Sequence, residues 1–179
     1  MAGFRELVGQ RILKNKQKNL NRETRVHNFD TAKSAVILFD ALKKDAFKII
    51  REFQGFLKNK GISCTVYGYV NQKETPPDML FWKDLYMINK SNLNWFLQPK
   101  GESVDLFKKE TPDILIDFNT DYRIELQFLV QLSPASFKIG CFTEEKNDYD
   151  LMIKLSGQED ISYLSEQIIH YVSILNPAN

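Results

Sequence analysis

The chain lacks the short signatures that mark many enzymes of this size. After the apolar stretch Ser34–Asp40 the sequence continues Ala-Leu-Lys-Lys, without a GxGxxG motif or a P-loop lysine. No GxSxG nucleophile elbow occurs either. These absences argue against the common phosphate-binding loops and against an α/β-hydrolase mechanism, and the sequence predicts no cofactor.

Cysteine and histidine are scarce. Cys64 and Cys141 each lie in a predicted strand, with no CxxC pair, and we interpret both as small buried residues. His27 and His170 are far apart in the sequence, and no residues have the spacing of metal ligands. The sequence therefore predicts neither a disulfide framework nor a metal site, and it offers no cysteine–histidine pair for nucleophilic catalysis.

Long apolar runs are also missing. No stretch approaches the length of a membrane span, and the N-terminus has no apolar signal-peptide core. We therefore expect a cytoplasmic protein. The net charge of the whole chain is only +1, so the molecule as a whole is not biased toward nucleic acid or acidic lipid.

The charge is unevenly distributed along the chain. Residues 1–33 carry eight basic and three acidic residues, a net charge of +5, so the remainder carries −4. A helix is expected over residues 4–20, with a short apolar stripe of Phe4, Leu7, Val8, Ile12 and Leu13. We predict a basic helical arm and connector over residues 1–33 and a single α/β domain over residues 34–179.

The stretch 112–142 carries the clearest information on the fold. Residues 113–118 are apolar and β-branched, as in a strand buried on both faces, and residues 137–142 form the next candidate strand. The segment 119–136 between them is too long for a hairpin but suits a parallel crossover. Its apolar residues fit either a strand or a helix, and the need for a crossover favours a helix.

A second strand–helix–strand unit precedes it. Strand 34–40 leads to an amphipathic helix over residues 46–57, which Gly61 is placed to cap, and then to strand 62–70. Further expected elements are strands 85–88 and 149–155, helical turns 90–97 and 102–110, and a last helix starting at the capping box 156–159. The order predicts a three-layer, Rossmann-like α/β sandwich with a mostly parallel sheet.

Ligands of open α/β sheets bind beyond the carboxyl ends of the strands. The residues expected at or near this rim are Asp40, Asn71, Asn89, Asn94, Trp95, Asp117 and Asn119. Asp40 and Asp117 could form a carboxylate pair, or each could bind turn amides and cap the following helix. Trp95 could stack on a base or sugar, or pack as a core aromatic.

A set of motifs resembles a family of small uncharacterised cytoplasmic α/β proteins from Bacteroidota. In chain order the motifs are FDTAKSAVILFDA, NWF at 94–96, PDILIDF at 112–118, SPASFKIG at 133–140 and YDLMIKL at 149–155. The resemblance covers about residues 28–160. It implies an α/β fold and brings no activity with it.

Two of these motifs are also similar to the N-terminal half of heptosyltransferase-type glycosyltransferases. In those enzymes a strand ending in IDL is followed by a helix and then by a strand with an RIG-like motif. Ile116-Asp117-Phe118 and Lys138-Ile139-Gly140 are similar to these two motifs. The similarity implies a Rossmann-like sheet. Those enzymes bind sugar nucleotide mainly in a second domain, for which 179 residues leave no room.

Two classes of function remain open. The first is a non-catalytic binding or adaptor protein that presents its basic arm to a protein partner or to RNA. The arm residues placed to contact such a partner are Arg11, Lys14, Lys16, Lys18, Arg22 and Arg25. Alternatively, the arm is a solvated helix packed on the domain. The second class is a small enzyme or nucleotide-binding or sugar-nucleotide-binding protein with its site at the strand-end rim.

Overall fold

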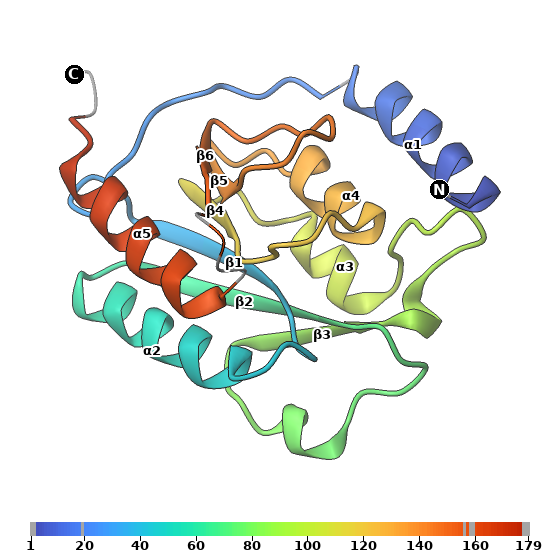
Figure 1. The fold of residues 1–179 in the computed structure, drawn as a ribbon, viewed down its shortest axis with the longest axis horizontal. Coiled ribbons are helices and arrows are strands. Elements are labelled where there is room, and N and C mark those ends of the chain that lie inside the picture. Colours follow the sequence, from blue (N-terminus) through green and yellow to red (C-terminus); the bar gives the residue numbers. More distant parts are fainter. Residues whose placement is uncertain (1–2, 19, 156, 158–159, 177–179) are drawn as a thin grey trace.

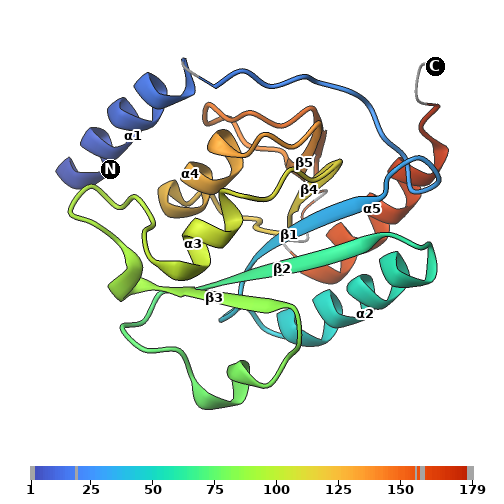
Figure 2. The ribbon, with the colours of Figure 1, turned by 180° about the vertical axis from the view of Figure 1, so that it is seen from behind.

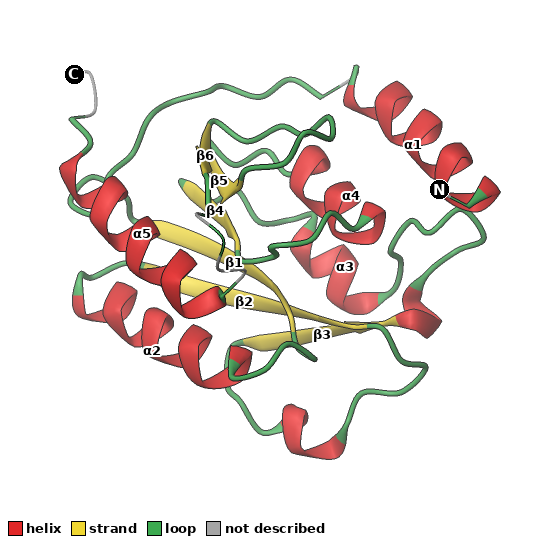
Figure 3. Cartoon of the chain, in the orientation of Figure 1, coloured by secondary structure: helices red, strands yellow, loops and turns green. Residues whose placement is uncertain are grey.

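The computed structural model describes residues 3–18, 20–155, 157 and 160–176. A six-stranded, all-parallel sheet forms the middle layer, with the strand order β3-β2-β1-β4-β5-β6 (Figures 1 and 3). The strands are β1 (Ser34–Asp40), β2 (Ser63–Val70), β3 (Leu85–Asn89), β4 (Ile114–Asp117), β5 (Phe137–Cys141) and β6 (Leu151–Ile153). The helices are α1 (Phe4–Gln17), α2 (Ala46–Asn59), α3 (Glu102–Phe107), α4 (Ile124–Leu132) and α5 (Ile161–Ile174), with short 3-10 turns η1 (Pro77–Leu80) and η2 (Lys90–Asn92).

The predicted Rossmann-like α/β fold is thus confirmed. The strand order is that of doubly wound dinucleotide-binding sheets, in which the direction of strand addition reverses between β1 and β4. Strands β1 and β4 occupy this central position, and from Ala35 to Asp40 and from Ile114 to Asp117 every residue is buried. Helices on both faces explain why these stretches are continuously apolar instead of alternating.

Two helices cover each face of the sheet. Helices α2 and α5 pack over the side that contains Ile37, Phe39 and Ile116, whereas α3 and α4 cover the side that contains Val36 and Leu115 (Figures 1 and 2). Helix α2 ends where Gly61 adopts a φ of +77°, a left-handed conformation that glycine enters without a Cβ clash.

The crossover between β4 and β5 is helical, as its length required. Helix α4 occupies Ile124–Leu132 and ends just before Pro134. The strands on either side of it run parallel, with Ile116 opposite Ile139.

Some local predictions were wrong in their boundaries. Of the expected capping box 156–159, residues 156, 158 and 159 lie outside the described residues, and the described part of the last helix is Ile161–Ile174. It starts at Ile161, where the Asp160 carboxylate accepts a hydrogen bond from the Ser162 amide. The expected turn 90–97 is helical only over Lys90–Asn92, because Leu93 then forms an isolated antiparallel bridge with Pro99.

The N-terminal segment packs along the domain. Leu13 of α1 is 2% exposed and lies in a cluster with Ile124 and Phe128 of α4. The connector then runs past the amino ends of the strands (Figure 1), where the Arg25 amide donates to the Ser136 carbonyl just before β5. Phe29 enters the core beside α2. Helix α1 therefore presents one face to α4 and the opposite face to solvent.

The buried centre of β4 makes a stability test. Ile116→Ala should lower the free energy of unfolding by about 2–5 kcal/mol, because it leaves a cavity between the sheet and helices α2 and α5. Ile174→Ala is the matched control, since Ile174 is 60% exposed near the end of α5. Urea denaturation monitored by circular dichroism would measure both. A loss at Ile116 no larger than that at Ile174 would contradict the packing described for β4.

Candidate functional site

The strand-end rim places its two carboxylates on one face of the sheet but gives them separate partners. Leu38 of β1 is opposite Asp117 of β4, so the strands are adjacent, as the paired-carboxylate hypothesis required. Asp40 accepts a hydrogen bond from the Leu42 amide at 2.9 Å, and its other oxygen lies 3.0 Å from the Arg123 guanidinium. Asp40 therefore braces the turn after β1 and the start of α4.

Asp117 is enclosed completely. One carboxylate oxygen accepts hydrogen bonds from the backbone and side-chain amides of Asn119, and the other accepts a 2.6 Å hydrogen bond from the Tyr149 hydroxyl. Its side chain is 1% exposed, and burial raises its pKa above the ordinary value even though these donors favour the charged form. A carboxylate held in this way has no face open to a substrate.

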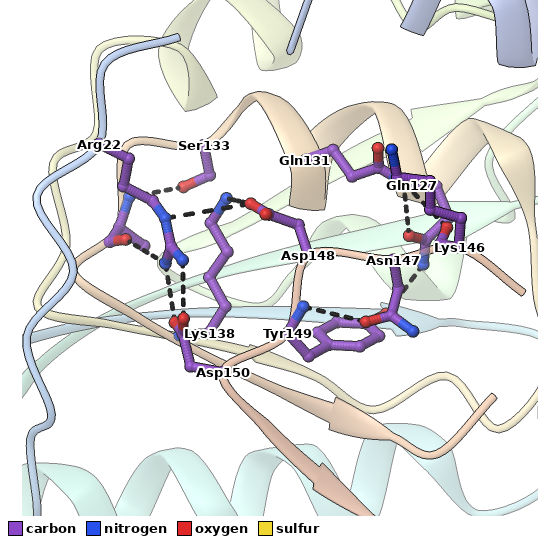
Figure 4. A network of polar contacts seen from close by, with 11 residues as sticks. Arg22, Gln127, Gln131, Ser133, Lys138, Lys146, Asn147, Asp148, Tyr149 and Asp150 are labelled. Atoms are coloured by element: carbon purple, nitrogen blue, oxygen red, sulfur yellow. Dashed lines mark hydrogen bonds and ion pairs between the residues drawn. The ribbon is translucent and has the colours of Figure 1, made fainter. Parts of the chain in front are cut away.

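Tyr149 closes the rim because Gly140 makes room for its ring. A Cβ atom added at Gly140 would lie 2.5 Å from Cε1 of Tyr149, so a larger residue in β5 would displace the ring. The Tyr149 hydroxyl also accepts a 2.9 Å hydrogen bond from Gln127 of α4. Gln131 then links Gln127 to the Lys146 carbonyl. Figure 4 shows these side chains of α4 meeting the loop after β5. Through the Tyr149–Asp117 hydrogen bond they cover the end of β4.

A second polar group lies beside Tyr149 and ties the connector to the sheet. Lys138 of β5 is fully buried, and its ammonium lies 2.6 Å from Asp148. Burial lowers the pKa of Lys138, and Asp148 opposes this shift. Arg22 makes two 2.7 Å hydrogen bonds to Asp150 and a third to the Ala135 carbonyl (Figure 4). Its guanidinium is therefore used within the fold, and the Asp150 hydrogen bonds raise its pKa.

Sequence reasoning missed the roles of Lys138, Tyr149 and Asp148. The available signal was a lysine inside the buried strand SFKIG, followed at a short distance by the acidic turn NDYD. A buried lysine requires a nearby carboxylate, so the lysine in the strand predicts that the acidic turn packs against it.

The other predicted rim residues do not join Asp117. Asn71 is exposed, and its side-chain oxygen lies 3.5 Å from the Tyr69 hydroxyl. Asn89 caps η2, and Asn94 accepts hydrogen bonds from the amides of Phe96 and Gln98. Trp95 is 57% exposed and lies against Phe4 of α1, with the ring centres 6.1 Å apart. Asn119 alone accompanies Asp117.

A small cavity lies on the face of the sheet that α2 and α5 cover, between the starts of these two helices. It has a volume of about 290 Å³, and Lys43, Lys44 and Thr120 line it together with Asp45 and Asp160. Lys43 also pairs with Asp121 at 2.5 Å. The aspartates precede the first turns of the two helices, where they offset the positive helix ends that would otherwise attract a phosphate.

The solvent side of α1 is an open surface that contains several of the predicted arm cations. Phe4, Leu7, Arg11, Lys14 and Lys18 follow one another at helical spacing along its solvent side. Phe4 is 73% and Leu7 54% exposed, and together with Trp95 they form an apolar half beside a cationic half. We call these six residues the α1 patch. The Arg5 guanidinium donates to the Trp95 carbonyl at 2.6 Å and holds the loop against the helix.

The remaining predicted arm cations differ in their surroundings. Lys16 donates to the Gln98 side chain at 2.9 Å, and Arg25 is exposed on the connector. A groove of about 310 Å³ borders the α1 patch, where Arg11 and Lys14 face Tyr122, Glu145 and Lys146. The structure thus places Arg11, Lys14 and Lys18 together, and it assigns Arg22 to the interior network.

Comparison with known proteins places the chain in a family. The sequence model of a family of unknown function, DUF6913, matches residues 5–175, so the chain belongs to this family. A search of the curated proteins finds no match. Within the described residues, no cluster of three or more His, Cys, Asp or Glu side chains could hold a metal ion. None of the described helices is both long and apolar enough to cross a membrane.

The burial of Asp117 predicts a pH effect on stability. Its pKa is higher in the folded protein than the ordinary value of 3.8, so its stabilising contribution is complete below that value and is lost as the pH rises through the folded pKa. Compared with Asp117→Asn, the wild type should therefore lose stability as the pH increases from about 4. The limit is about 1.4 kcal/mol per pH unit.

Urea unfolding of both proteins between pH 4 and pH 8 would measure this change. Hydrogen bonds lost in the asparagine variant produce a constant offset, whereas the change with pH reports the carboxyl group. Asp105→Asn, on the exposed side of α3, is the control. A pH-dependent difference for Asp117 no larger than that for Asp105 would contradict the described burial.

Proposed function

We propose that the protein is a non-catalytic adaptor that binds an acidic, amphipathic segment of a partner protein on the α1 patch. The observation that carries the proposal is the contrast between the two predicted sites. The strand-end carboxylates are enclosed by their own fold, whereas α1 exposes an ordered apolar and cationic surface.

The chemistry of the α1 patch favours a peptide over RNA. Its apolar half contains the aliphatic Leu7 beside Phe4 and Trp95, and its cations follow on the next turns of the helix. Apolar side chains of a partner would cover the rings, and acidic side chains would then reach Arg11 and Lys14. Exposed tryptophan and arginine are the residue types that most often dominate binding at protein interfaces. RNA would instead need phosphate contacts alternating with bases along the whole surface.

Two contacts hold the α1 patch in a fixed shape. Leu13 fixes α1 on α4, and the Arg5–Trp95 hydrogen bond fixes the loop that presents the indole. A rigid surface loses little conformational entropy when it binds. The proposal retains the cytoplasmic location and the relationship to Bacteroidota proteins that the sequence resemblance implies.

A sugar-nucleotide or nucleotide site at the strand ends is the alternative that the heptosyltransferase resemblance implies. The cavity beside Lys43 and Lys44 would have to hold the phosphates. Asp45 and Asp160 on its wall, together with Asp121 on Lys43, leave it without a positive surplus, which weighs against this alternative.

Photo-crosslinking in the producing cell tests the proposal. A photoreactive amino acid in place of Leu7 should form an adduct with a protein partner, and the same group in place of Lys73 should not. Arg11→Glu/Lys14→Glu should weaken the association roughly tenfold, because two attractive charges of the α1 patch become repulsive toward an acidic partner. Lys73→Glu/Lys109→Glu makes the same change in net charge at exposed positions outside the patch and should have little effect.

The affinity of the captured partner would be measured by titration at two salt concentrations, because charge contacts on a surface weaken as salt rises. Equal losses for both double variants would mean that binding follows net charge alone, and the proposal would fail. If ribonuclease digests the adduct, the partner on the α1 patch is RNA and not a protein. Phosphate-dependent protection of Lys43 and Lys44 from chemical modification would support the alternative site.

A further inference from the structure

A second open surface lies on the opposite side of the sheet from α1, along α2. A groove of about 810 Å³ runs between α2 and the loop after η1. Lys48, Arg51 and Lys58 line it from the helix, and Lys83 lines it from the loop. The acidic residue among the lining side chains is Glu52, so cations predominate. We call this surface the α2 groove.

The loop holds an aromatic ring out into solvent. Phe81 is 88% exposed, the highest exposure among the large apolar residues described. Its neighbour Trp82 is anchored: the indole N–H donates to Gln54 at 3.1 Å, and the ring lies 5.8 Å from that of Phe47. Because Trp82 is anchored to α2, the loop is fixed next to Phe81. The Phe81 ring therefore projects from an anchored loop and not from a free one.

The cations of α2 form a row. Lys48, Arg51 and Lys58 share one helix face with Gly55, at steps of three and four residues. The row extends about 15 Å along the helix axis. A Cβ atom added at Gly55 would have no heavy atom within 4 Å, so the surface is open between Arg51 and Lys58. Lys58 lies 3.5 Å from Asp84, and the pair is largely exposed.

From these features we propose that the α2 groove binds single-stranded nucleic acid. A row of cations follows a phosphate backbone, and exposed aromatic rings stack on unpaired bases. All the apolar side chains that line the groove, Phe47, Phe81 and Trp82, are aromatic. This distinguishes the groove from the α1 patch, where an aliphatic side chain favours a peptide. The groove is independent of the proposed adaptor surface and is tested separately.

The test is fluorescence anisotropy with a labelled oligo(dT) probe and full-length protein. Phe81→Ala should weaken binding roughly tenfold, the cost of losing one stacked base. Phe81→Trp should retain binding, because the ring is kept. Lys48→Ala/Arg51→Ala should lower the slope of log affinity against log salt by about 1.4, the value for two phosphate contacts on a single strand.

Lys109→Ala/Lys154→Ala is the matched control, since it removes two exposed lysines outside the groove. Circular dichroism would verify that each variant is folded. The proposal is overturned if the probe does not bind, if Phe81→Ala binds as tightly as the wild type, or if the control variant loses as much affinity as Lys48→Ala/Arg51→Ala. It is also overturned if heparin or poly-glutamate competes for the groove as well as unlabelled oligo(dT), because neither carries a base.

Discussion

The hydrogen bond from Tyr149 to Asp117 determines how the carboxyl edge of the sheet is used. In doubly wound folds this edge is where ligands bind, because the chain reversal leaves a crevice there. Here Gly140 admits the tyrosine ring, Gln127 orients its hydroxyl, and the buried carboxylate receives it at 2.6 Å. The loop after β5 then lies across the sheet and is held by the Lys138–Asp148 pair. The usual binding position is filled by the protein itself.

Because the carboxyl ends of the strands are closed, the open surfaces lie on the outer helices. The fold retains the topology of a nucleotide-binding sheet, yet fold does not specify function. The two carboxylates at the ends of β1 and β4 are bound by other groups of the protein. Helices α1 and α2 carry the surfaces that the fold does not use. They lie on opposite sides of the sheet, so a partner on one leaves the other accessible (Figures 1 and 2). This separation is compatible with the proposed adaptor function.

The sequence predicted the sheet better than the site. Buried strands such as 113–118 are recognisable because both faces are apolar, and the length of 119–136 required a parallel crossover. The rim was predicted from strand ends alone, which gave the correct position of Asp117 but not its environment. Tyr149 lies 32 residues further along the chain, and its contact with Asp117 depends on a loop path that no local pattern specifies. The cations of the α1 patch were predicted, but its apolar half was not, because Trp95 reaches Phe4 from a distant loop.

The most direct measurement is a nuclear magnetic resonance titration of the ¹⁵N-labelled protein with an acidic amphipathic peptide derived from a crosslinked partner. If the partner binds on α1 while the strand ends stay closed, the amide signals of Leu7, Arg11 and Lys14 and the indole signal of Trp95 should shift. The amide signals of Asn119 and Thr120 should remain in place. Shifts concentrated at Asn119, Thr120 and the loop 41–45 would contradict the proposed binding on α1, because a ligand would then occupy the strand ends that Asp117 and Tyr149 close.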